Sequence, residues 1–259
     1  MLLKRKTNHT DVEDREVIIF VHGLVGTISG FKREITECGK TYRCIAYNLI
    51  GHGDDRGEKK AFSMELLVQQ LKEIYEANNI TRAHLCCLSY GGYIGILFAQ
   101  QYPEYVQSIC YIGGHYNNPS ELFDVFHTHY HKKSSNYKSW LKDYARAIYP
   151  KGKFWDNHYS VVSEGIYYTW GLKLEESIIK EAIRHRLEIP IKHIIARLQI
   201  PILWVMGERD ELYKSCLYDL HELNPRIKYY EIPSAGHAAN VFRPSAFLEL
   251  YLGFLTAVN

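Results

Sequence analysis

The sequence predicts an α/β fold in which helices flank a mostly parallel sheet. Two observations predict it: short apolar runs recur along the chain, and helical patterns of apolar residues separate several of them. Strands and helices that alternate in this way are typical of a doubly wound core. The 259 residues suffice for one such domain with an inserted subdomain.

The strands are expected where short runs are almost wholly apolar, as in strands that are buried on both faces. Five such runs are Val17–Val21, Cys44–Tyr47, His84–Leu88, Ser108–Ile112 and Ile202–Met206. Lys228–Ile232 is expected to add a sixth strand. Apolar residues at helical spacing predict helices over Met64–Tyr75, Gly92–Gln101 and Arg243–Leu255.

The segment from about Tyr116 to Gln199 interrupts this alternation. It has no strand-like run, and 14 residues between Tyr116 and Trp170 are aromatic. Such a segment has an apolar surface of its own to bury. We therefore expect a helical cap, residues 116–199, inserted into a core formed by residues 1–115 and 200–259.

Composition restricts the classes of function. The net charge of +2 is too small to indicate binding to nucleic acid or an anionic membrane, and no run is apolar enough for a membrane span. The N-terminus lacks the apolar stretch of a signal peptide, and the six cysteines have no CxxC spacing. Cys86 and Cys87 would project to opposite faces of a strand, so a reduced, cytoplasmic compartment fits best.

The first chemical motif follows the expected strand His84–Leu88, where Ser89-Tyr90-Gly91-Gly92 opens a helix. A tight strand-to-helix turn of this kind, the nucleophile elbow, holds a serine hydroxyl clear of the sheet. In the motif G-x-S-x-G, Cys87 stands at the first position. Because cysteine is small, we expect the turn to form with slightly tighter packing. Ser89 is therefore the candidate nucleophile.

A second segment follows the expected strand Val17–Val21, which ends in His22-Gly23. In the loop after it, the backbone amide of Leu24 can face that of Tyr90. Two convergent N–H groups form an oxyanion hole, worth roughly 3–4 kcal/mol of transition-state stabilisation per donor. We expect the His22 side chain itself to be structural.

The acid and the base of a catalytic triad are expected after the last two strands. Asp210 follows Ile202–Met206 at the sheet edge where α/β active sites form, with Glu208 and Glu211 as alternatives. His237 follows Lys228–Ile232 in a loop of small residues. Nucleophile, acid and histidine in this chain order distinguish one triad architecture from the others.

These motifs together resemble the α/β-hydrolase superfamily. The resemblance rests on His22-Gly23, Gly51-His52-Gly53, Ser89-Tyr90-Gly91-Gly92, Gly207-x-x-Asp210 and Gly236-His237. It implies an α/β-hydrolase fold with a helical cap, and a serine hydrolase with a triad of Ser89, Asp210 and His237.

Three features depart from the family's pattern. Cys87 replaces a glycine, and Asn48 stands where an aspartate usually precedes Gly51 by three residues. The segment before Val17 is short for the customary opening hairpin, so the sheet is expected to lack a strand. None of these departures removes a member of the triad.

The resemblance implies that Ser89 attacks the carbonyl of an ester or thioester, with no metal or organic cofactor. Serine at the elbow excludes the haloalkane dehalogenases and epoxide hydrolases of this fold, which use aspartate there. The aromatic cap suggests an apolar acyl group, or else aromatic residues that only pack the cap helices together. Tyr116, Trp140 and Trp155 are the candidate substrate-binding residues.

Two other functions stay open. The same triad could cleave a carbon–carbon bond or catalyse an elimination on a diketone or succinyl-type substrate. Some elimination enzymes of this kind have an arginine four residues after the serine, where this chain has Tyr93. A ligand sensor with little turnover could also use the scaffold.

The expected partner is a small-molecule ester or thioester, bound by a monomer or homodimer. The segment 119–199 carries 13 Lys/Arg against 9 Asp/Glu. This charge fits a solvated helical surface, or a docking face for an acidic substrate or an acyl carrier protein.

Overall fold

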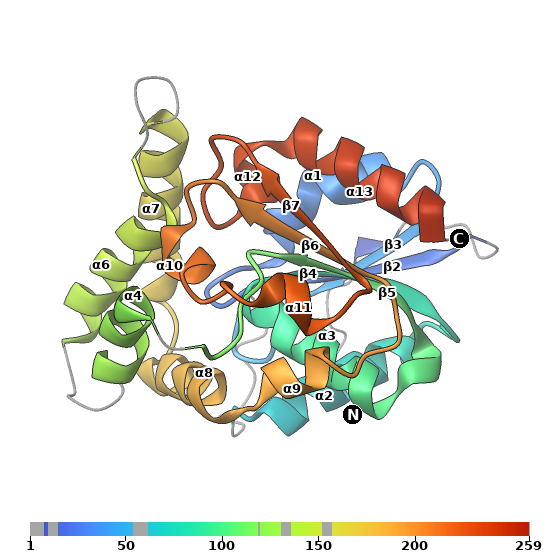
Figure 1. Ribbon diagram of the computed structural model, residues 1–259, viewed down its shortest axis with the longest axis horizontal. Coiled ribbons are helices and arrows are strands. Elements are labelled where there is room, and N and C mark those ends of the chain that lie inside the picture. Colours follow the sequence, from blue (N-terminus) through green and yellow to red (C-terminus); the bar gives the residue numbers. More distant parts are fainter. Residues whose placement is uncertain are drawn as a thin grey trace.

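A seven-stranded sheet forms the centre of the protein, with helices on both of its faces (Figure 1). The computed structural model describes residues 8–9, 15–53, 62–118, 120–130, 136–151 and 157–258. The strand order is β1-β3-β2-β4-β5-β6-β7, and every neighbouring pair is parallel except β1 with β3. The strands are β1 (Asn8–His9), β2 (Val17–Val21), β3 (Arg43–Tyr47), β4 (Ala83–Leu88), β5 (Val106–Ile112), β6 (Ile202–Gly207) and β7 (Ile227–Ile232).

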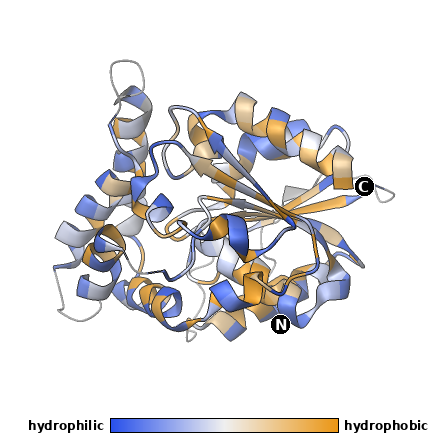
Figure 2. Cartoon of the chain, in the orientation of Figure 1, coloured by the Kyte–Doolittle hydropathy of each residue, from blue (hydrophilic) through white to orange (hydrophobic). Residues whose placement is uncertain are grey.

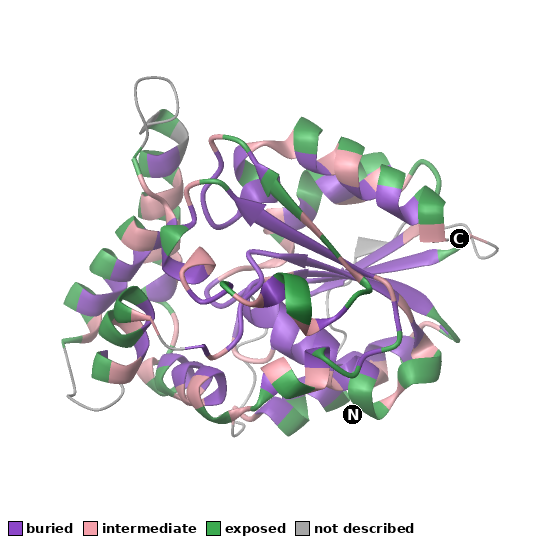
Figure 3. Cartoon of the chain, viewed as in Figure 1, coloured by how far each residue is buried: buried purple, intermediate pink, exposed green. Residues whose placement is uncertain are grey.

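All six expected strands form, as β2 to β7, and the central ones are buried on both faces (Figures 2 and 3). In β7 exposed and partly buried residues predominate, because this strand lies at the sheet edge. The opening strand, expected to be missing, is reduced to two described residues: Asn8 and His9 pair with Ala46 and Ile45 of β3. The described residues before β2 thus hold one strand of the customary hairpin; residues 1–7 and 10–14 lie outside the described part of the chain, so the lack of a strand stays a prediction.

Two layers of helices enclose the sheet (Figure 1). One layer, α2 (Met64–Ala77), α3 (Tyr90–Gln101) and α9 (Ile191–Ile195), packs on the face that carries Cys87. The other, α1 (Lys32–Cys38), α12 (Ala239–Phe242) and α13 (Pro244–Val258), packs on the face that carries Cys86. The two adjacent cysteines thus lie on opposite faces, as the sequence predicts, and all six cysteines are buried and form no disulfide.

Short helical turns complete the core. They are the 3₁₀ turns Ile28–Phe31 and Pro103–Tyr105, with α10 (Glu211–Lys214) and α11 (Leu220–Leu223) between β6 and β7. Among the described helices, none is long and apolar enough to cross a membrane.

The chain between β5 and β6 is helical in its described parts. It forms α4 (Glu121–Phe123), a π-helical turn (Asp124–Thr128), α6 (Tyr137–Ile148), α7 (Asn157–Gly171), α8 (Glu176–Glu188) and α9. Ser120 and Asn136 cap α4 and α6 with side-chain oxygens that accept backbone N–H groups. Figure 1 places α4, α6 and α7 at one end of the sheet. Nevertheless β5 and β6 pair directly, so these helices are an insertion between neighbouring strands.

Candidate active site

Ser89 forms the turn between β4 and α3. Its backbone has φ 51° and ψ −116°, a region that costs a residue other than glycine about 1–3 kcal/mol. Two hydrogen bonds hold the turn: the Ser89 amide donates to the Ile112 carbonyl, and the Gly92 amide donates to the Ser89 carbonyl, each at 2.8 Å. The strained serine expected of a nucleophile elbow is therefore present.

Gly91 allows helix α3 to begin directly against β2. A Cβ atom at Gly91 would overlap the carbonyl oxygen of Val21 and lie 2.7 Å from that of His22. A Cβ at Gly92 would overlap the ring of Tyr111. Positions 91 and 92 therefore both require glycine. These two glycines determine how closely the elbow approaches the sheet.

Cys87 fits at the first position of the motif because Gly95 leaves space for it. A Cβ atom at Gly95 would lie only 2.7 Å from the Cys87 sulfur. Burial raises the pKa of the Cys87 thiol, so it is a protonated packing group rather than a competing nucleophile.

His237 and Asp210 form a hydrogen bond between loops that follow different strands. Nδ1 of His237 lies 2.6 Å from Oδ2 of Asp210, and the two residues are 4% and 0% exposed. Asp210 is also the N-cap residue of α10, with Oδ1 3.5 Å from the Tyr213 amide nitrogen. The backbone amide of His237 donates to the Ile148 carbonyl at 3.1 Å. His237 is thus held in place both by its ring and by its backbone amide.

The second imidazole nitrogen, Nε2 of His237, is buried and has no hydrogen-bond partner among the described residues. An ionised carboxylate only accepts, so the proton of the neutral ring lies on Nδ1 and Nε2 keeps its lone pair. The alternative acids are occupied or exposed: Glu208 accepts the Ser234 amide at 2.7 Å, and Glu211 faces solvent. Of the three carboxylates, Asp210 is the one bonded to the histidine.

Ser89 and His237 both lie near the carboxyl end of β5. The Ser89 amide bonds to Ile112, and a Cβ at the next residue, Gly113, would lie 2.8 Å from Cε1 and Nδ1 of His237. No hydrogen bond joins the serine to Nε2 in this structure. Such bonds are often long before substrate binds. The Asp210–His237 half of the predicted triad is formed, and the serine lies at the same strand end.

The loop after β2 passes beside the elbow. A Cβ at Gly23 would lie 3.0 Å from the Leu88 carbonyl oxygen and 3.2 Å from Cβ of Ser89. Tyr90 is the first residue of α3, so its amide has no acceptor within the helix. The oxyanion hole from the Leu24 and Tyr90 amides stays a prediction that this arrangement allows.

The His22 side chain is structural, as expected. Its Nδ1 donates to the Gly23 carbonyl at 2.8 Å, and its Nε2 accepts the Leu49 amide at 3.0 Å. Burial, with His52 nearby, lowers the pKa of His22 to about 3, so the ring is neutral. Asn48, in place of the usual aspartate, accepts the Ile28 amide at 3.0 Å and ties the same loops together.

The fold and these motifs agree with a comparison to known sequence families. The family described as alpha/beta hydrolase fold matches residues 16–159, more than half of the chain. The chain belongs to this family. Known alpha/beta hydrolases and related proteins can therefore be set beside it.

Curated relatives of this alpha/beta hydrolase are distant. A protein provisionally named carbamate hydrolase RutD, of Pantoea ananatis, is 25% identical over 259 residues, covering 93% of this chain and 89% of the relative. The 3-oxoadipate enol-lactonase 1 of Acinetobacter baylyi is 20% identical over 257 residues, covering 95% and 91%. Among solved structures, an N-acyl homoserine lactone degrading enzyme has a TM-score of 0.81 at 18% identity, covering 96% of each chain. This last similarity shows the fold.

Two of the three candidate substrate-binding residues of this alpha/beta hydrolase have protein partners. The Tyr116 hydroxyl donates to Asp219 at 2.7 Å, and the Trp140 indole donates to the Phe126 carbonyl at 2.7 Å. Trp140 also stacks on Tyr144, with ring centroids 4.9 Å apart. Trp155 lies outside the described residues. A role in substrate binding stays a prediction for all three.

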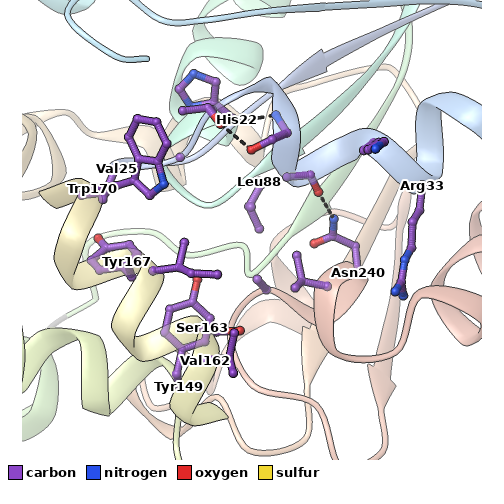
Figure 4. A pocket seen from close by; sticks show the side chains of 18 of the residues that line it. His22, Val25, Arg33, Leu88, Tyr149, Val162, Ser163, Tyr167, Trp170 and Asn240 are labelled. Atoms are coloured by element: carbon purple, nitrogen blue, oxygen red, sulfur yellow. Dashed lines mark hydrogen bonds between the residues drawn. The ribbon is translucent and has the colours of Figure 1, made fainter. Parts of the chain in front are cut away.

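A cavity of about 450 Å³ lies between the core and α7 (Figure 4). Leu88, which precedes Ser89, and Ala238, which follows His237, are part of its wall. Most of the wall is apolar, and the residues from α7 are Val162, Ser163, Ile166, Tyr167 and Trp170. The sequence prediction missed these positions, because the aromatic density marked the whole segment and not one face of one helix.

A group of buried polar residues beside His237 was also missed. The ring of Tyr213 lies 4.6 Å from the imidazole of His237, and the ring of His115 lies 4.0 Å from that of Tyr213. His127 and Arg186, from the inserted helices, complete this group and are fully buried. No sequence pattern marked these residues, although Tyr213 follows Asp210 by three positions.

Proposed function

We propose that this protein is a serine hydrolase that cleaves an ester or thioester bond through an acyl-enzyme on Ser89. The observation that carries the proposal is the 2.6 Å bond between Asp210 and Nδ1 of His237, which leaves Nε2 unpaired at the strand end where Ser89 forms its strained turn. A neutral imidazole oriented in this way is the general base that an otherwise weak serine nucleophile needs.

The chemistry proceeds in two steps. Ser89 gives its hydroxyl proton to Nε2 of His237 and attacks the carbonyl, while Asp210 stabilises the imidazolium that forms. The amides of Leu24 and Tyr90 donate to the oxyanion, and His237 then protonates the leaving group. Water, deprotonated by the same imidazole, releases the acid and restores the serine.

Two features support the substrate class. The apolar cavity that borders Leu88 and Ala238 suits an apolar group attached to the reacting carbonyl. An enol-lactonase among the relatives also supports hydrolysis of an ester, since a lactone is a cyclic ester. We further propose that residues 116–199 act as the cap that covers this site.

The test compares S89A with the wild type on 4-nitrophenyl esters of increasing acyl length, with S163A as a control in the cavity wall. We expect S89A to lose at least about 10³-fold in kcat with its fold intact, and S163A to stay within about threefold. A fluorophosphonate probe should label Ser89 and no other residue. Unchanged turnover by S89A, or a label on another serine, would refute the proposal.

A further inference from the structure

Arg186 of α8 is a fully buried cation that binds no carboxylate among the described residues. Its side chain is 0% exposed. Nη1 lies 3.5 Å from the Tyr144 hydroxyl, whereas Nε and Nη2 have no hydrogen-bond partner in the described ranges of the chain. A guanidinium stays protonated in proteins, and burying an unpaired charge costs several kcal/mol. A fold that keeps such an unpaired charge in its interior indicates that a ligand supplies the missing hydrogen-bond acceptors.

Among the described residues, the surroundings of Arg186 contain rings rather than anions. The guanidinium carbon lies 5.6 Å from the ring centroid of Tyr90 and 5.9 Å from that of Tyr213. Burial, followed by the charge of Arg186, holds the pKa of His115 and of His127 well below its usual value, so both rings are neutral. No anion in the described part of the chain therefore compensates the positive charge of this site.

The carboxylates of α8 are bound on another side of the helix. Glu181 and Glu188 form ion pairs with Arg184, which is 41% exposed. Arg184 and Arg186 are two positions apart, so they project about 200° apart around the helix. One arginine faces solvent and its acidic partners, while the other faces the interior without any.

The unpartnered atoms of Arg186 have the geometry of a carboxylate receptor. The N–H groups of Nε and Nη2 project in parallel from one edge of the planar guanidinium, and this edge binds both oxygens of a carboxylate at once. Further buried atoms of this group lack partners among the described residues: the Tyr93 hydroxyl, Nε2 of His115 and Nδ1 of His127. They can add hydrogen bonds to a polar ligand.

This receptor adjoins the candidate active site. Tyr213 separates the guanidinium from the catalytic base, since its ring also lies 4.6 Å from the His237 imidazole. Tyr90, the other ring beside Arg186, directly follows Ser89 in the chain. One aromatic ring therefore lies between Arg186 and each of these two positions, the His237 imidazole and the residue that follows Ser89.

We propose that Arg186 binds a carboxylate of the substrate, so that the preferred ester or thioester carries a second, anionic group near the scissile bond. This inference rests on the proposed function and specifies its substrate class. The carboxylate can lie on the acyl side or on the alcohol side of the ester, and the two sources are distinguished by experiment.

The kinetic test uses matched pairs of esters. Mono-4-nitrophenyl succinate, glutarate and adipate are compared with neutral 4-nitrophenyl esters of equal chain length, and 3-acetoxypropanoate with propyl acetate. We expect the wild type to prefer the carboxylate member of one series by about 10- to 100-fold in kcat/KM, mainly through a lower KM. R186M should abolish this preference and leave the neutral esters within about threefold, whereas R184M should change neither.

R186K is a second variant, which keeps the charge but loses the two-pronged edge, and we expect it to retain part of the preference. Replacing a buried charge by a hydrophobic residue of similar volume is often neutral for stability, so R186M is expected to fold. A wild type that prefers neutral esters, or an R186M that loses both substrates equally, would overturn the inference.

Binding separates this inference from the proposed function. Glutarate, succinate or adipate should raise the Tm of S89A, and R186M should remove the rise while R184M keeps it. Labelling of Ser89 without any carboxylate preference or Tm shift would refute the role of Arg186 and leave the serine hydrolase intact. A Tm shift that depends on Arg186, without labelling or ester turnover, would refute the hydrolase instead.

Discussion

Replacing Asp210 with asparagine tests how the imidazole is oriented. The wild-type carboxylate accepts the Nδ1 proton of His237 over 2.6 Å, which leaves Nε2 free to accept the proton of Ser89. In D210N, the side-chain amide donates to Nδ1 and the ring proton moves to Nε2. The histidine then cannot act as the base for Ser89, although the shape of the site is kept.

The expected loss is about 10⁴-fold in kcat, because the variant holds the inactive tautomer and no longer stabilises the imidazolium. At 1.36 kcal/mol per factor of ten, this is about 5 kcal/mol of activation free energy. Folding should change little, since asparagine caps helices as well as aspartate does, and Asp210 caps α10. The prediction therefore pairs a large kinetic loss with a small shift in Tm.

The assay measures kcat on a 4-nitrophenyl ester and Tm by circular dichroism for the wild type, D210N and D219N. Asp219 is a matched control, because its carboxylate likewise accepts a hydrogen bond from a buried side chain. That side chain is Tyr116 and not His237. D219N should keep its activity within about tenfold and lose some stability. If D210N keeps a tenth or more of the wild-type kcat, Asp210 does not orient the histidine.

Two further predictions concern packing and pH. G95A should lower the free energy of unfolding because the new methyl meets the Cys87 sulfur, and C87G in the same chain should restore it, with a coupling of about 1–3 kcal/mol; additive effects would contradict the contact. Burial raises the pKa of Glu34 to about 7, so its neutral form is favoured in the fold, and the stability it contributes below about pH 4.5 is lost as the pH rises through 7. In urea denaturation, E34Q should therefore have a free energy of unfolding about 3 kcal/mol higher than the wild type at pH 8, and the same value as the wild type at pH 4. Stability profiles of the two proteins that run parallel between these pH values would refute this.

The sequence was sufficient to predict the sheet and the strand ends that carry the candidate site. Buried parallel strands need continuous apolar runs, and β2 to β6 have them; parallel strands also bring their carboxyl ends to one edge, so the serine, acid and histidine could be located from chain order. The two-residue strand β1 was not predicted, because a pairing of Asn8 and His9 leaves no apolar pattern.

The helical segment between β5 and β6 could be predicted, but the residues in it that line a pocket could not. Aromatic residues that line a pocket and those that pack helices are buried alike, so composition could not distinguish Trp140, which packs against Tyr144, from Tyr167, which lines the cavity. Arg186 was counted among the positive charges of a solvated surface. Which side of α8 faces inward depends on how the helices pack together. The spacing of residues along the sequence does not predict this packing.

The direct pairing of β5 with β6 has a consequence for how this protein can diversify. The long segment inserted between these strands begins and ends at neighbouring strands that already pair by hydrogen bonds. Its sequence can therefore change while the pairing of β5 with β6 keeps its register. If the inserted segment acts as the proposed cap, exchanging it with that of another family member should transfer substrate preference as a unit and leave the candidate triad on the sheet unchanged.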